Sequence, residues 1–169
     1  LYTSADDLDF NNLLFLRKYL KLTATSGAYV AGGCFKNIFT NSKVKDIDIF
    51  FATLADCKLG IHSYMRLVED TSNNWIKVYE NAKVYSCKDL DTGIRVELIK
   101  GLYLSPKDLL NEFDFTITQF AYFRSRLWNE DDEKGYTCLY SKDFFEHLMQ
   151  HRLVIANLTY PVSTFERVL

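Results

Sequence analysis

Proline and glycine are scarce in this chain of 169 residues, which has two prolines and seven glycines. Because so few residues interrupt helices and strands, long linkers and low-complexity tracts are not expected, and intrinsic disorder is disfavoured. Apolar residues at 48% and charged residues at 25% are ordinary for a globular protein. A chain of this length is expected to bury one sizeable core.

Closely spaced cysteines and long apolar runs are also missing. The four cysteines (Cys34, Cys57, Cys87 and Cys138) include no C-x-x-C pair, so nothing indicates a disulfide framework or a cysteine-rich zinc site. No apolar run approaches the roughly 20 residues that span a bilayer. The acidic start "TSADDLDF" lacks the basic region of a signal peptide. These features predict a cytoplasmic protein without a membrane partner.

A strong net charge is the third absence. The sequence has 22 acidic and 20 basic residues and a net charge of −2, so any nucleic-acid contact must rest on a local patch. The 13 Phe and 11 Tyr residues are interpreted first as core and second as base-stacking surface. One candidate nucleic-acid path consists of Arg124, Arg126 and Lys142 beside Tyr122 and Trp128, with an ordinary mixed surface as the alternative.

Helical and strand patterns are interspersed along the chain. Apolar spacing predicts helices over 7–22, 34–41, 54–70, 105–113, 142–152 and from about 161. Strands are predicted over 28–31, 45–52, 75–80, 83–88, 94–100 and 136–141, with a strand-like start for 114–123. The expected fold class is α+β, close to α/β, with a mixed central sheet flanked by helices.

Two units are expected within this organisation. Residues 1–128 are predicted to form the main domain. Residues 129–169 are predicted to add a strand and helices that pack on it or begin a following helical region. The chain starts at Leu1 instead of Met and stops at "TFERVL", a helix just begun, so further protein is expected beyond one or both ends.

Two aspartates stand on one face of an apolar strand in "KDIDIFF". Asp46 and Asp48 share that face, about 7 Å apart, because side chains alternate along a strand. Inside a sheet the two carboxylates repel each other unless a cation lies between them, and their hard oxygen ligands suit Mg²⁺. The alternative is an edge strand with two solvated aspartates. Glu97, in the middle of "RVELIK", offers a third carboxylate if its strand pairs beside this one; otherwise it is a cross-strand partner for Arg95 or a lysine.

Two glycines precede this strand. Gly32 and Gly33 end one strand and open the next helical segment, where glycine permits positive φ and close approach of an anion to the helix N–H groups. Lys36, one turn later, adds a cation for phosphates. The alternative for the glycines alone is a tight turn. Strand, glycine pair, helix and D-x-D strand nevertheless follow in the order that a metal–nucleotide site requires.

The order of these motifs resembles the nucleotidyltransferase superfamily that includes DNA polymerase beta. The matching residues are "GGCFKN" (32–37) and "DIDI" (46–49), with twelve residues between Gly33 and Asp46. The head domain of tRNA CCA-adding enzymes and bacterial poly(A) polymerases, G-G-x-V-R-D followed by D-[IV]-D-[IL], is the most similar branch. "FDFTITQFAYF" also resembles its R-R-D-F-T-I-N-A-x-A-Y segment, and "PVSTFERVL" faintly resembles its D-P-x-R-[ML]-L-R string. The resemblance covers about residues 28–125.

The chain departs from that pattern at several positions. The arginine–aspartate pair after the glycines is Lys36-Asn37, the arginine pair before Asp114 is Glu112-Phe113, and these 169 residues include no recognisable tRNA-binding region. These differences favour a divergent, phage- or virus-like nucleotidyltransferase over a CCA-adding enzyme.

The resemblance implies roles for the matching residues. Asp46, Asp48 and Glu97 are expected to be the catalytic residues and to hold Mg²⁺ or Mn²⁺. Gly32, Gly33 and Lys36 are expected to bind the phosphates of an NTP, and Asp114 to brace the nucleotide pocket or touch the ribose.

The implied reaction moves a nucleoside monophosphate from an NTP to a hydroxyl, with an RNA or tRNA 3′ end as the expected acceptor. Two other functions stay open: a non-catalytic binding or assembly module that keeps the fold, and a toxin-like transferase that modifies a protein or tRNA. His147 and His151 share a helix face with Glu146 nearby, but they are expected to be solvated or capping residues and not zinc ligands.

Overall fold

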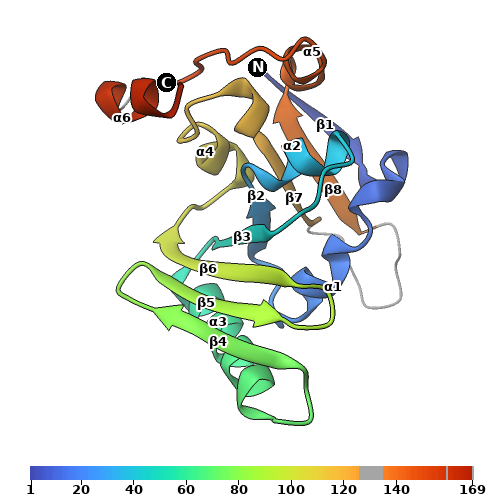
Figure 1. Cartoon of the computed structure of the whole chain (residues 1–169), viewed down its shortest axis with the longest axis vertical. Helices are drawn as coiled ribbons and strands as arrows, with labels where there is room; N and C mark the ends of the chain where they lie inside the picture. The colour runs from blue at the N-terminus through green and yellow to red at the C-terminus, as the bar shows by residue number, and fades with distance from the viewer. Residues whose placement is uncertain (126–134, 159, 169) are drawn as a thin grey trace.

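The computed structural model describes residues 1–125, 135–158 and 160–168 (Figure 1). In these residues one sheet of eight strands has the order β1-β8-β7-β2-β3-β6-β5-β4. The strands are β1 (Tyr2–Asp6), β2 (Ala28–Ala31), β3 (Asp46–Phe51), β4 (Trp75–Glu80), β5 (Val84–Asp89), β6 (Ile94–Leu102), β7 (Phe120–Arg124) and β8 (Tyr136–Ser141). Only β3 and β6 pair in parallel within this sheet; the other neighbours are antiparallel. The expected α+β class with a mixed sheet is confirmed.

Short helices connect these strands. They are α1 (Leu16–Lys21), α2 (Cys34–Phe39), α3 (Leu54–Glu69), α4 (Pro106–Leu110), α5 (Phe144–Met149) and α6 (Pro161–Val168), with 3-10 turns η1 (Asp7–Asp9), η2 (Asn11–Leu13) and η3 (Thr116–Thr118). Caps define two of the starts, because the hydroxyl of Thr53 accepts the amide of Asp56 at α3 and that of Ser105 accepts the amide of Asp108 at α4. Most predicted elements are confirmed, with ends shifted by a few residues.

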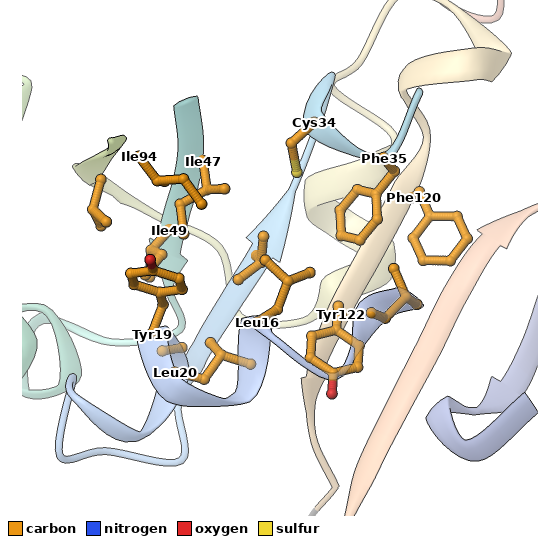
Figure 2. Close-up of a cluster of buried hydrophobic side chains, with 14 of the residues drawn as sticks. Leu16, Tyr19, Leu20, Cys34, Phe35, Ile47, Ile49, Ile94, Phe120 and Tyr122 are labelled. Atoms are coloured by element: carbon orange, nitrogen blue, oxygen red, sulfur yellow. The ribbon is translucent and has the colours of Figure 1, made fainter. Parts of the chain in front are cut away.

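The main core lies on one face of the sheet, under α1, α2, α3 and α5. Figure 2 shows side chains from α1 and α2 converging on those of the strands. Aromatic residues fill much of it: the Phe120 ring stacks on Phe35 at 4.4 Å and on Tyr140 at 5.2 Å between centroids. These contacts support the interpretation of the aromatics as core.

The opposite face of the sheet is only partly covered. A smaller buried cluster joins β2, β3 and β7 to α4 through Tyr29, Ala31, Phe50, Leu109, Leu110 and Ala121. Farther along the sheet, β6, β5 and β4 form an antiparallel meander with α3 along its core side (Figure 1). Half-buried charged side chains, among them Glu97 and Lys88, stand on this strip of the second face. The candidate site lies where the covered and open parts of this face meet.

The helix predicted over 7–22 is wrong in its first half. The chain forms β1 and two 3-10 turns before α1 begins. The fully buried Asp7 explains this path, because its carboxylate accepts hydrogen bonds from Arg17 at 2.9 Å and from Tyr122 at 2.7 Å. Asn11 and Asn12 also favour turns over helix interior, since their side chains compete for backbone groups.

The strand-like start predicted for 114–123 is confirmed only at Phe115, which is extended and forms an isolated antiparallel bridge with Ile155. Residues 116–118 form η3, and β7 begins only at Phe120. The Thr118 hydroxyl donates to the Phe115 carbonyl at 2.8 Å, a local bond that stabilises the turn. The predicted division at residue 128 stays a prediction, but β8 of the second unit lies between β1 and β7 in the common sheet.

Other expectations concern burial and the membrane. All four cysteines are buried and free. No helix in the described part of the chain has both the length and the apolar character to cross a bilayer. The nucleic-acid path predicted beside Tyr122 is wrong for Tyr122, which is fully buried, and for Arg124, which is only 8% exposed. Lys142 is exposed, and its part in such a path stays a prediction; Arg126 and Trp128 lie outside the described residues.

Candidate functional site

The turn between β2 and α2 requires a glycine at its first position. Gly32 has φ +103°, and its amide donates to the Phe120 carbonyl at 3.3 Å. A Cβ at this position would lie 3.4 Å from the Phe113 ring and 3.8 Å from Oδ2 of Asp48. The next residue, Gly33, is exposed and has open space where a Cβ would stand. The turn therefore brings the start of α2 beside Asp48 and leaves an open face above it.

Asp48 and Glu97 are register partners on the parallel strands β3 and β6. The pairing on which the prediction for Glu97 depended is therefore present. The row continues across the sheet through Ser86 on β5 to Tyr79 on β4. The Tyr79 hydroxyl donates to Oε1 of Glu97 at 3.4 Å. The Ser86 hydroxyl is buried and has no hydrogen-bond partner within the described structure.

The electrostatics of the row centre on Asp48. Burial, followed by the nearby charges of Glu97 and Asp46, raises the pKa of the Asp48 carboxyl to about 7. Burial and the Asp48 charge also raise the pKa of the Cys34 thiol at the start of α2. Three carboxyl groups therefore repel one another around Asp48. We refer to Asp46, Asp48 and Glu97 as the carboxylate trio.

The chemistry of this trio fits a divalent cation. Carboxylate oxygens are the ligands that Mg²⁺ and Mn²⁺ prefer, and a cation would offset both the burial of the Asp48 charge and its repulsion by Glu97 and Asp46, which together raise the Asp48 pKa. The orphaned Ser86 hydroxyl lies in the same row and is suited to bond a cation-bound water. The chemistry of these residues suits the divalent cation that the sequence predicted, but the ligand atoms of the trio do not all lie within 4.8 Å of one another in the described residues, and the metal site stays a prediction.

Asp46 has a second neighbour that the prediction assigned differently. It is exposed at the start of β3, and Nε of Arg95, its register partner on β6, lies 3.7 Å from its Oδ1. The arginine that was the alternative partner for Glu97 thus pairs with Asp46.

A second acidic cluster lies at the start of α5. In the part of the chain that the structure describes, the acid and histidine groups with ligand atoms within 4.8 Å of one another are Asp143, Glu146 and His147. The carboxylate trio is more open than this set.

Lys36 does not join the carboxylate trio. It lines a hollow of about 470 Å³ between α2 and α5, together with Asn37, Thr40, Ser42, Ile117, His147, Leu148, His151, Arg152 and Leu153. His147, expected to be solvated or capping, is buried, and its Nδ1 lies 2.7 Å from the Thr116 hydroxyl. The phosphate role of Lys36 stays a prediction that this geometry does not support.

Asp114 attaches α6 to the rest of the structure. Its carboxylate forms a salt bridge with Arg167 and accepts a hydrogen bond from the Thr164 hydroxyl at 3.3 Å. Its backbone carbonyl accepts the amide of Ala156 at 2.6 Å. These contacts hold α6 and the segment at Ala156 against Asp114, and the role expected for Asp114 in the nucleotide pocket stays a prediction.

Sequence reasoning missed a basic hollow next to Asp46. Lys43 and Lys45 precede the D-x-D strand, and their run "KVKD" was the available signal. Asn37 holds this loop in place, because its Nδ2 donates to the Lys43 carbonyl at 3.2 Å and its own carbonyl accepts the Ser42 amide at 2.9 Å. An aspartate, which the resembling family has at this position, cannot donate that bond.

A wider hollow lies away from these groups. It has about 620 Å³ and runs along α3, lined by Leu54, Cys57, Lys58, Leu59, Ile61, His62, Met65, Glu80 and Lys100. None of the carboxylate trio lines it. Volume alone therefore does not identify the chemical site.

Comparison with known proteins gives two results. Residues 7–151 match the model of a family described as "Gad2: Gabija anti-defense 2 family protein". No curated protein matches the sequence.

Several solved structures have the same fold. The Thermotoga maritima CCA-adding enzyme complexed with tRNA matches 98% of this chain with a TM-score of 0.64 and 18% identity. A CCA-adding enzyme in complex with ATP matches 98% with a TM-score of 0.64 and 19% identity. A tRNA nucleotidyltransferase complexed with a primer tRNA and an ATP analogue matches 82% with a TM-score of 0.54 and 21% identity.

The extent of these matches limits what they show. The chain spans 39%, 40% and 37% of the three solved chains, so well under half of each enzyme is represented. At this identity, the likeness establishes the nucleotidyltransferase fold.

Proposed function

We propose that this chain, which belongs to the Gabija anti-defense 2 family, is a metal-dependent nucleotidyltransferase. It would move a nucleoside monophosphate from an NTP to a hydroxyl group, with an RNA 3′ end as the acceptor. The observation that carries the proposal is the pairing of Asp48 with Glu97 across β3 and β6, beside the turn at Gly32. The family description refers to action against a defence, and we propose this transfer as the chemistry behind that role.

The carboxylate trio would hold Mg²⁺ or Mn²⁺ in this site. Such a cation, when bound, neutralises phosphate charge and lowers the pKa of an acceptor hydroxyl. The open backbone at Gly33, where a Cβ would meet nothing within 4 Å, leaves room for the triphosphate. This open turn supports the nucleotide-binding role proposed for Gly32 and Gly33, while the role of Lys36 stays a prediction.

Glu97 would accept the proton in the transfer. The acceptor oxygen forms a bond to the α-phosphorus, the bond from that phosphorus to the bridging oxygen of the β-phosphate breaks, and pyrophosphate leaves. The proton of the acceptor hydroxyl passes to a Glu97 oxygen, and the Tyr79 hydroxyl orients that carboxylate from β4. Positioning and charge stabilisation supply most of the rate increase in such reactions.

A second candidate is a binding or assembly module that keeps this fold without catalysis. Two observations favour it: Arg95 lies beside Asp46, and Lys36 faces a different hollow. The fold is equally compatible with a toxin-like transferase that modifies a protein or tRNA. The carboxylate trio would bind the metal and the nucleotide, and it does not determine which acceptor is used.

Calorimetry separates catalysis from the module. The chain is titrated with each NTP in Mg²⁺ or Mn²⁺, and the parent is compared with Asp46→Asn, Asp48→Asn. The proposal expects metal-dependent heat for the parent and its loss in the double variant. A matched control, Asp143→Asn with Glu146→Gln, removes the same charge from the other acidic cluster and is expected to bind NTP as the parent does. Equal binding by the double variant and the parent would show that the site is assigned wrongly.

Transfer itself is tested with labelled NTPs and total RNA, separated by size. Label in RNA that disappears in the Asp48→Asn variant supports the RNA acceptor. Label in protein instead of RNA would favour the toxin-like transferase, and metal-dependent NTP binding without label in either would favour the module.

A further inference from the structure

A hollow of about 280 Å³ lies at the start of β3, next to Asp46. Its lining consists of Lys43, Lys45, Asp46, Lys88, Gly93 and Arg95. Four of these residues are positive and one is negative, in a chain whose net charge is −2. A local excess of positive charge in an acidic protein favours binding of an anion at that place. We refer to this site as the basic hollow.

Backbone pairing fixes the cations of the basic hollow in place. The Arg95 amide donates to the Lys45 carbonyl at 2.9 Å, which joins the start of β6 to the residue before β3. Lys88 on β5 is the register partner of Arg95. The bond from Asn37 to the Lys43 carbonyl holds the remaining loop against α2. Cations from two distant parts of the sequence, residues 43–45 and the hairpin of β5 and β6, therefore meet on a framework of hydrogen-bonded strands.

The basic hollow and the glycine turn lie at different sides of the carboxylate trio. Gly32 adjoins Asp48 from β2, whereas the hollow reaches Asp46 from β6 and β5. The turn at Gly32 is the proposed position of the NTP phosphates. In phosphoryl transfer, the attacking oxygen and the leaving oxygen are roughly in line on opposite sides of the phosphorus. An anionic acceptor is therefore expected to enter from the side of the basic hollow.

We propose that the basic hollow binds backbone phosphates of the nucleic-acid strand whose terminal hydroxyl accepts the nucleotide. The assignment of that strand as acceptor rests on the proposed function, while the binding of the strand can be measured without any reaction. Among the described residues, the lining includes no aromatic or aliphatic side chain, so it lacks the apolar anchors of protein interfaces. Lysine and arginine without base-reading partners suit phosphates of any sequence.

Fluorescence anisotropy with a labelled single-stranded oligonucleotide, as RNA and as DNA of one sequence, tests the binding. The variant combines Lys43→Gln, Lys45→Gln and Lys88→Gln and leaves Arg95 and the carboxylate trio intact. The matched control combines Lys21→Gln, Lys58→Gln and Lys107→Gln, three exposed lysines elsewhere on the chain. Both variants change the net charge equally, and all six positions are exposed or half-buried, so folding is expected to be kept and is checked by circular dichroism.

The expected result is a loss of oligonucleotide affinity in the hollow variant on the order of 30-fold at low salt. The slope of log affinity against log salt is expected to fall by about 2, since each neutralised phosphate of a single strand contributes about 0.7. The control is expected to change affinity by no more than about threefold. NTP binding in the presence of Mn²⁺, measured by calorimetry on the same samples, is expected to be equal in the hollow variant and the parent.

Four outcomes would overturn the proposal. The first is that the parent binds no oligonucleotide, and the second is that the hollow variant and the control lose equal oligonucleotide affinity. The third is that the hollow variant loses NTP binding but keeps oligonucleotide binding, and the fourth is that polyglutamate at equal charge concentration displaces the oligonucleotide from the parent. The second outcome indicates a general charge effect, the third places the triphosphate in the hollow, and the fourth indicates an acidic protein partner. Failure of the proposed function is distinguishable, because it removes metal-dependent NTP heat and leaves the hollow-dependent oligonucleotide binding unchanged.

Discussion

Asp48 and Glu97 lie opposite each other in the register of β3 and β6, the one parallel pair among the described strands. A crossover through α3, β4 and β5 separates them in sequence, so the sheet and not the local chain brings the two acids together. Burial and this neighbour, with Asp46, hold the pKa of Asp48 at about 7. A pair of like charges maintained inside a fold costs stability, and such sites are candidates for function.

The first prediction concerns the pH dependence of stability without divalent cations. Burial and the neighbouring acids raise the pKa of the Asp48 carboxyl in the folded state from its ordinary value of 3.8 to about 7. The stability that this group contributes is therefore full below about pH 4 and is lost as the pH rises to about 7. The asparagine of Asp48→Asn cannot ionise, so this variant does not lose that stability. Its melting temperature should therefore exceed that of the parent by an amount that grows from pH 4 to pH 7. At higher pH the difference should be roughly 5 °C.

Thermal denaturation in EDTA between pH 4 and pH 8 measures this difference. Glu166→Gln, an exposed carboxylate on α6, serves as the control and should give a difference that does not change with pH. A flat difference for Asp48→Asn as well would mean that the Asp48 carboxyl titrates normally and that the carboxylate trio does not interact.

The second prediction uses the two adjacent glycines as a matched pair. Gly32→Ala places a Cβ at φ +103°, where side chains are strained, and should lower the free energy of unfolding by about 1–2 kcal/mol. Gly33→Ala meets open space at φ −68° and should leave stability within about 0.5 kcal/mol of the parent. Urea denaturation measures both values.

The same pair also tests the nucleotide site. If the triphosphate approaches the open backbone at Gly33, then Gly33→Ala should weaken NTP binding about tenfold although its stability is unchanged. NTP affinity equal to that of the parent in a stable Gly33→Ala protein would place the phosphates elsewhere, for example at the hollow that Lys36 lines.

The sequence was most informative where local rules decide structure. Period-two alternation placed β3, β4, β5 and β6, and the capping pattern at Ser105 placed α4. The motif around Gly32 and the D-x-D pair indicated the fold, because both depend on short segments whose spacing is set by backbone geometry. Glu97 was predicted as a third acid only on the condition that its strand paired beside β3, and the structure fulfils that condition.

Long-range contacts account for what the sequence did not predict. β1 was missed because its pairing with β8 joins opposite ends of the chain and leaves no local signal. Lys36 was assigned to phosphates from its place one turn after the glycines; it lines the hollow beside α5, and its phosphate role stays a prediction. The basic hollow was missed for the same reason, since Lys88 reaches Lys45 only through sheet registers.

The third prediction concerns Asn37, the residue that replaces the aspartate of the resembling family. Asn37→Asp loses the bond to the Lys43 carbonyl and places a negative charge near the C-terminal end of α2, where it is unfavourable. The free energy of unfolding should fall by about 1 kcal/mol, as measured by urea denaturation. Asn37→Ala removes only the bond and should cost less. If Asn37→Asp is as stable as the parent, the amide is not what holds the loop of the basic hollow.

The fourth prediction concerns the buried anchor of the N-terminal segment. Asp7 is fully buried, lies 2.7 Å from NH2 of Arg17 in a salt bridge and accepts the hydroxyl of Tyr122. Asp7→Asn removes the charge but keeps the shape, so the Arg17 guanidinium loses its buried counter-charge. Because an uncompensated charge of this kind is costly, the free energy of unfolding should fall by about 3 kcal/mol.

Asp9→Asn is the matched control, because Asp9 is exposed on the same turn η1 and should change stability by less than about 0.5 kcal/mol. A double variant, Asp7→Asn with Arg17→Met, tests the cause. Since it removes the stranded charge together with its partner, it should recover part of the stability lost in Asp7→Asn. A double variant that is less stable than Asp7→Asn would show that Arg17 contributes mainly by packing against Tyr136, whose ring centroid lies 4.6 Å from its guanidinium carbon, and not by pairing with Asp7.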